Sequence, residues 1–127
     1  MYLMYSDESN LEAQDNTFFI YGGIIIDADK AKDLSDKVQR IRGRCGIPST
    51  FVLKFKPKPS GIEETKFIEC KQKIIQAAID SECYLSLSLI HHGVARNPVN
   101  ARRNEINRVA YHFNCFLRRK GSVRKTV

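Results

Sequence analysis

The chain has 127 residues, of which 43% are hydrophobic and 28% charged. This composition allows one modest hydrophobic core and is not that of an intrinsically disordered chain. The longest apolar stretch, from Phe18 to Ile26, is interrupted by Gly22-Gly23 and is much shorter than the roughly 20 residues that a membrane span needs, so no membrane partner is expected. No basic segment followed by an apolar run begins the chain, so we expect a cytoplasmic protein whose four scattered cysteines are reduced.

The net charge of +7 is concentrated near the C-terminus. Residues 96–127 contain nine Lys and Arg against a single acid, Glu105, whereas residues 1–95 contain twelve Lys and Arg against thirteen acids. Such a basic segment can neutralise nucleic-acid phosphates, and it is equally typical of a solvated helix face followed by a basic end. The side chains that we single out as candidates for nucleic-acid binding are Arg102, Arg103, Arg118 and Arg119.

Four segments have the composition of β-strands. Residues 2–6 form a short β-prone run, and residues 17–26 are apolar on both faces, which predicts a central strand buried on both sides. Gly22-Gly23 within this run predicts a bulge or a close backbone approach. Residues 50–56, ended by two prolines, and the alternating segment 83–90 are the third and fourth predicted strands.

Three helices are predicted between and after these strands. Their starts are marked by Asp29, by Ser60 with Glu63 at capping-box spacing, and by Asn97-Pro98. The third helix is expected to end near Gly121. The predicted order is β-β-α-β-α-β-α, an α/β fold in which helices flank a mixed sheet. We expect a single domain over residues 1–121 and a basic tail over residues 122–127.

Asp7 and Glu8 follow the first predicted strand, at an edge where α/β sheets often bind ligands. Asp7 is the better candidate for a metal ligand because consecutive strand residues point to opposite faces. A strand-end Asp-Glu-Ser-Asn cluster is also ordinary turn chemistry. His91 and His92 should emerge near the same edge, either as auxiliary residues that contact water or phosphate or simply as loop histidines. Lys54 could meet a phosphate or extend from an edge strand into solvent.

Three motifs in this order resemble the domain-of-unknown-function 3800 family: Asp7-Glu8-Ser9 after an aromatic-rich strand, the run Phe19–Ile26, and Leu53-Lys54-Phe55 before a helix. The family is widespread in bacteria and phages. The resemblance implies a ribonuclease-H-like fold and metal-dependent cleavage of nucleic acid phosphodiesters. It assigns catalytic roles to Asp7 and Glu8, with Asp7 as a ligand of Mg²⁺ or Mn²⁺.

The chain departs from the family pattern at three places. Asn10 stands where the family usually has glycine, Val52-Leu53-Lys54 lacks a carboxylate that is often present, and no acid follows Glu105. Since two-metal hydrolysis needs several carboxylates, we expect an incomplete catalytic set, a truncated domain and weak or no nuclease activity. Whether the chain is an enzyme is left open. The alternative is a catalytically incomplete domain that binds nucleic acid or a protein, with self-association through an uncovered sheet edge.

Overall fold

The computed structural model describes residues 1–9, 17–54, 57–93 and 98–121. They form two compact units. The sheet unit comprises Tyr2–Ile25 and the described residues from Tyr84 onward, and the helical unit comprises Met1 with Ile26–Cys83. Within the described ranges, none of the helices has an apolar stretch long enough to span a membrane.

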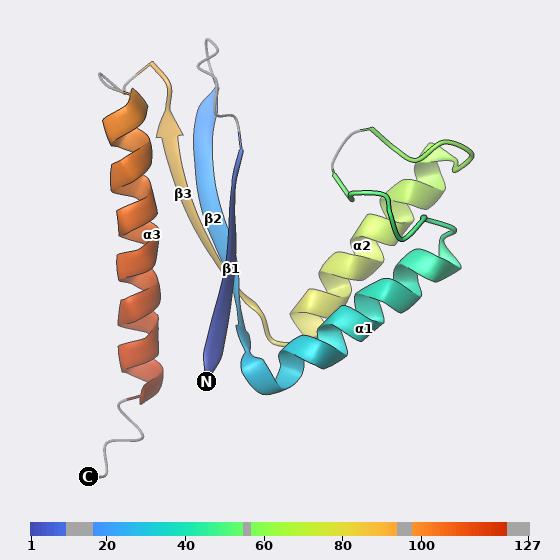
Figure 1. Cartoon of the computed structure of the whole chain (residues 1–127), viewed down its shortest axis with the longest axis horizontal. Helices are drawn as coiled ribbons and strands as arrows, with labels where there is room; N and C mark the ends of the chain where they lie inside the picture. Colours follow the sequence, from blue (N-terminus) through green and yellow to red (C-terminus); the bar gives the residue numbers. More distant parts are fainter. Residues whose placement is uncertain (10–16, 55–56, 94–97, 122–127) are drawn as a thin grey trace. The chain divides into compact units, whose positions relative to one another are not determined.

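The sheet unit contains three strands and one long helix (Figure 1). Their bounds are Tyr2–Ser9 for β1, Phe18–Asp27 for β2, Tyr84–His91 for β3 and Pro98–Gly121 for α3. The strand order is β1-β2-β3, and β2 pairs antiparallel with β3 from Phe18 opposite His91 to Ile25 opposite Tyr84. The predicted central position of β2 is therefore confirmed, whereas the described strands form an antiparallel sheet and not the mixed sheet that we expected.

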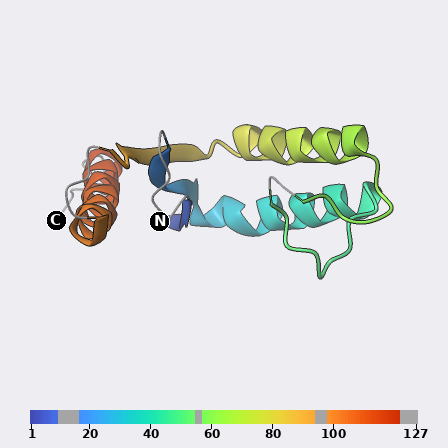
Figure 2. The same ribbon diagram turned by 90° about the horizontal axis from the view of Figure 1, so that it is seen from above.

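Helix α3 packs along one face of the sheet, as Figures 1 and 2 both show. Its Val109 and Phe116 side chains are buried. The Phe116 ring meets the rings of Tyr2 and Tyr84 edge-on, with centroid distances of 5.0 and 4.9 Å. Because side chains of directly paired strand residues lie on the same face, Ile25, which pairs with Tyr84, also belongs to this covered face.

The opposite face of the sheet carries exposed apolar side chains, which we call the open face. They are Phe18 and Ile24 of β2 with Leu85, Leu87 and Leu89 of β3. The expectation that residues 17–26 are buried on both faces is therefore wrong. In the sheet unit α3 packs against the other face, so the alternation along β2 leaves Phe18 and Ile24 exposed.

The two consecutive glycines of β2 stand where neighbouring strands come close. A Cβ on Gly22 would lie 2.8 Å from the carbonyl oxygen of Ser86, and one on Gly23 would lie 2.9 Å from the carbonyl oxygen of Tyr5. Either contact is closer than packed atoms allow. The close approach that Gly22-Gly23 predicted is therefore present in the structure.

The helical unit is a pair of helices, α1 (Ala28–Arg44) and α2 (Glu64–Asp80), which lie side by side in Figures 1 and 2. Four buried residues form its core: Cys45, Ile47, Phe67 and Cys70. Asp27, and not Asp29 as expected, caps α1: its carboxylate accepts a hydrogen bond from the Asp29 amide at 3.0 Å.

The strand predicted over Thr50–Lys56 is wrong for residues 50–54, which form a turn and an irregular loop; residues 55 and 56 lie outside the described part. The apolar side chains of Phe51 and Leu53 pack against the core of the helical unit. The guanidinium of Arg42 donates hydrogen bonds to the carbonyl oxygens of Pro48 and Phe51, which holds this loop against α1. The apolar residues that predicted a strand thus pack against the core of a helix pair.

The capping box predicted at Ser60 and Glu63 is also wrong. Helix α2 begins at Glu64, and Glu63 occupies the capping position without a side-chain hydrogen bond. Gly61 has a φ of +80°, a left-handed conformation that turns the chain between the two predicted partners. The described elements follow the order β-β-α-α-β-α, so the α/β class is confirmed while the predicted order is not.

Candidate nucleic-acid interface

Helix α3 carries most of the positive charge that the sequence places near the C-terminus. It begins at Pro98 and ends at Gly121, close to the predicted limits. Its sequence contains one acid, Glu105, and six basic residues: Arg102, Arg103, Arg108, Arg118, Arg119 and Lys120. The helix therefore has a formal excess of five positive charges.

Glu105 is buried between α3 and the sheet, with only 2% of its surface exposed. Its carboxylate accepts a hydrogen bond from the Ser88 hydroxyl of β3, and its other oxygen lies 3.0 Å from a guanidinium nitrogen of Arg108. A buried carboxylate needs such partners because leaving it unpaired is costly. The one acid of α3 is thus held on the covered side, and the outer side of the helix carries no negative side chain.

Polar and basic side chains follow one another along the outer side of α3 at intervals of four, four, three and four residues. At this spacing they lie on a single face of a helix. All are exposed, and we call them the outer strip: Arg103, Asn107, Tyr111, Asn114 and Arg118. From the first to the last, the strip extends about 22 Å along the helix axis. It combines two arginines with two amides and one aromatic ring, groups that bind phosphates and bases.

The remaining basic residues of α3 are placed differently. Arg119 is exposed near the end of the helix. Lys120 donates a hydrogen bond from its Nζ to the hydroxyl of Tyr84 at 3.0 Å, and its ammonium lies over the rings of Tyr84 and Phe116. Lys120 therefore contributes to the packing of α3 against the sheet. The side chain of Arg102 lies outside the described residues.

Asp7 and Glu8, the predicted catalytic pair, lie within β1 and not in a loop after it. Both side chains are exposed. The Asp7 carboxylate accepts a hydrogen bond from the Glu8 backbone amide at 2.8 Å. Consecutive residues of a strand point to opposite faces, so Asp7 and Glu8 do not converge on one point.

His91 ends β3 and lies at the same end of the sheet as the end of β1 (Figure 1). Strand β2 separates β1 from β3, so their backbones are about 10 Å apart. The Nδ1 of His91 accepts a hydrogen bond from the Gly93 amide, and its ring meets Phe18 edge-on at 5.1 Å. His92 follows, and its backbone amide donates to the carbonyl oxygen of Thr17. Neither histidine is brought against Asp7.

Among the described residues, the donor set does not provide the ligands of the Mg²⁺ or Mn²⁺ pair that the family resemblance implies. Hard divalent cations take six or more oxygen ligands, and a two-metal site needs several convergent carboxylates. In the part of the chain that the structure describes, no group of three Asp, Glu, His or Cys side chains is placed to hold a metal ion. Lys54, the other predicted phosphate contact, is exposed in the loop of the helical unit.

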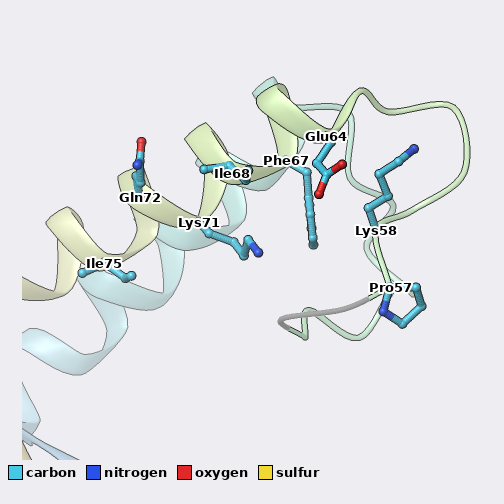
Figure 3. Close-up of a pocket in the computed structure, with 8 residues that line it drawn as sticks. All are labelled: Pro57, Lys58, Glu64, Phe67, Ile68, Lys71, Gln72 and Ile75. Carbon is cyan, nitrogen blue, oxygen red and sulfur yellow. The ribbon is translucent and has the colours of Figure 1, made fainter.

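The helical unit also has a mainly apolar cavity of about 590 Å³ along α2 (Figure 3). Phe67, Ile68 and Ile75 of α2 line it, together with Pro57 of the preceding loop. The Lys71 ammonium lies 4.5 Å from the centre of the Phe67 ring. Pro57 directly follows residues 55 and 56, which lie outside the described part, so this cavity carries no functional assignment.

Comparisons with protein-family models, with curated proteins and with solved structures found no match to this chain. The resemblance to the domain-of-unknown-function 3800 family therefore stays a prediction.

Sequence reasoning selected the arginines of α3 but missed its other functional features. The sequence contained a signal for the outer strip, since Asn107, Tyr111 and Asn114 recur at helical spacing between Arg103 and Arg118. It contained no signal for the burial of Glu105, because this depends on Ser88, a residue of a strand 17 positions earlier.

Proposed function

We propose that this chain is a nucleic-acid-binding domain that holds a phosphodiester backbone along the outer strip of α3. The single observation that carries the proposal is the burial of Glu105. With this acid paired to Ser88 and Arg108, the outer side of a helix about 36 Å long carries no negative side chain.

Electrostatics gives the physical basis. A helix face without acids attracts a polyanion, and each phosphate that an arginine neutralises releases a condensed counterion. Arg103 and Arg118 are exposed, so they can reach phosphates without losing a buried partner. Asn107 and Asn114 between them add hydrogen-bond donors for phosphate or sugar oxygens.

The family resemblance supports the same class of ligand. We propose a ribonuclease-H-like relationship for the sheet on the sequence motifs, and a cytoplasmic location on the scattered cysteines and the lack of an export-type segment in the given sequence. Cleavage is not part of the proposal, because the described residues contain no group of three side chains placed to hold a metal ion.

The test is a binding titration with a fluorescently labelled oligonucleotide, followed by anisotropy at low salt. The variant Arg103→Glu/Arg118→Glu reverses two charges of the outer strip. The matched control, Arg40→Glu/Lys73→Glu, reverses two exposed charges of the helical unit and has the same net charge. We expect the first variant to lose at least about tenfold in affinity and the control to lose much less. Equal losses in both variants would show that net charge alone attracts the oligonucleotide, and the proposed interface would be wrong.

A further inference from the structure

Within the proposed function, we infer that α3 is specific for single-stranded nucleic acid and that Tyr111 is the residue on which an unpaired base stacks. Tyr111 lies in the middle of the outer strip, and 63% of its surface is exposed. A large exposed aromatic ring between two arginines is the arrangement that single-strand-binding proteins use as a stacking platform.

The Tyr111 side chain interacts with two neighbouring residues of α3, Cys115 and His112. Its hydroxyl hydrogen-bonds the thiol of Cys115, one helical turn further on, and this bond raises the pKa of Tyr111. A tyrosine hydroxyl, whose ordinary pKa is about 10, is neutral at physiological pH, so no phenolate repels the phosphates. The ring of His112 meets that of Tyr111 at a centroid distance of 5.9 Å and an angle of 61°. A ring anchored in this way loses little conformational freedom when a base stacks on it.

Two arginines flank the ring along the helix. Arg103 lies eight residues before Tyr111 and Arg118 seven residues after it, so each is about 10–12 Å away along the axis. A single strand can lie along α3 with its phosphates at these arginines and a base turned onto the ring. A duplex keeps its bases inside the helical stack, and turning one out costs a few kcal/mol. The ring therefore adds affinity for single strands and little for duplexes.

Exposure alone does not make a tyrosine a stacking residue. The chain contains another tyrosine, Tyr5, with which Tyr111 can be compared. Tyr5 of β1 is also 63% exposed, but Asp7 and Glu8 follow it on the same strand. Phosphates are repelled there. Tyr5 is therefore the matched control for Tyr111, with the same side chain and the same exposure in an acidic setting.

The experiment measures the affinity of the full chain for oligothymidine, oligouridine and a DNA duplex of equal length. We expect the two single strands to bind more tightly than the duplex. Tyr111→Ala should weaken single-strand binding about 5- to 100-fold, which is the range for losing one stacked base, and Tyr111→Phe should keep most of it. Tyr5→Ala should change it less than twofold.

A second readout reports the contact directly. The chain contains no tryptophan, so Tyr111→Trp and Tyr5→Trp each introduce a single fluorophore. Oligothymidine should quench the fluorescence of the first and leave that of the second unchanged. Wild-type affinity in Tyr111→Ala, equal affinity for the duplex, or no quenching in Tyr111→Trp would overturn the inference. If Arg103→Glu/Arg118→Glu still abolished binding in that case, the proposed function would stand without it. The absence of any binding would overturn both.

Discussion

The hydroxyl of Ser88 in β3 donates a hydrogen bond to the carboxylate of Glu105 in α3. This contact joins the helix to the sheet at a polar point of an interface that also contains the buried side chains of Val109 and Phe116. It also determines the charge of the opposite side of the helix, because it keeps the only acid of α3 away from the outer strip. One interaction thus links the packing of the sheet unit to the proposed interface.

We expect Glu105→Ala to lower the free energy of unfolding by about 1–3 kcal/mol, because it removes a buried hydrogen-bond partner of Ser88 and leaves a void. Glu69→Ala, which truncates an exposed glutamate of α2, should change it by less than about 0.5 kcal/mol. Urea denaturation measures both. Equal stability of the two variants would mean that Glu105 does not hold α3 on the sheet.

The core of the helical unit should make the stability of the chain pH-dependent in the alkaline range. Burial and a hydrogen bond with Cys45 raise the pKa of Cys70 from 9.0 to about 11. The folded state favours the neutral thiol, so this stabilisation is complete below pH 9 and is lost as the pH rises toward 11. The free energy of unfolding should fall over this range by up to about 3 kcal/mol more in the wild type than in Cys70→Ala. Parallel pH profiles of the two proteins would contradict the assignment.

Asp7 should bind a divalent cation only weakly, since its carboxylate is exposed and no group of three ligand side chains is found in the described part of the chain. A titration with Mn²⁺ followed by NMR should broaden the signals around Asp7 at millimolar concentrations, and this broadening should disappear in Asp7→Asn. We expect little or no Mg²⁺- or Mn²⁺-dependent cleavage of single-stranded, duplex or hybrid substrates. Robust cleavage that Asp7→Asn abolishes would show that other carboxylates complete a catalytic site.

The open face of the sheet should promote self-association. Leu85, Leu87 and Leu89 are 68%, 55% and 55% exposed along one side of β3, and apolar strips of this kind favour association. Leu85→Lys should weaken self-association by about 1–2 kcal/mol, as measured by sedimentation velocity over a range of concentrations. Val99→Lys on α3 is the control, since Val99 is 71% exposed outside this face. A monomeric wild type, or an equal effect of both variants, would contradict the prediction.

Much of the sheet unit could be predicted from the sequence because its signals are local. The alternation over residues 83–90 and the Asn97-Pro98 helix start each depend on neighbouring residues, and the structure has β3 at Tyr84–His91 and α3 from Pro98. The segment around Phe51 and Leu53 was wrongly predicted as a strand for the opposite reason. Its composition is typical of a strand, but its apolar side chains pack against the core that contains Phe67 and Cys70. Local propensity does not include such a distant partner.

The candidate site was predictable in part. The basic residues of α3 were evident from the charge distribution, and the amides and Tyr111 could be placed on the same face by helical spacing. The positions of Asp7 and His91 required the strand order, because only a sheet with β2 in the centre separates them. A sequence pattern can predict that two strands end at the same edge of a sheet, but it does not predict how many strands lie between them.

The most direct test of the account is the salt dependence of oligonucleotide binding by the wild type and by Arg103→Glu/Arg118→Glu. For a single strand, the logarithm of the association constant should fall linearly with the logarithm of the salt concentration, with a slope of about −0.7 for each phosphate neutralised. The account predicts a steep slope for the wild type and a slope less negative by about 1.4 for the double variant, which lacks two arginine contacts. A flat salt dependence, or the same slope in both proteins, would contradict the claim that the outer strip of α3 binds nucleic acid.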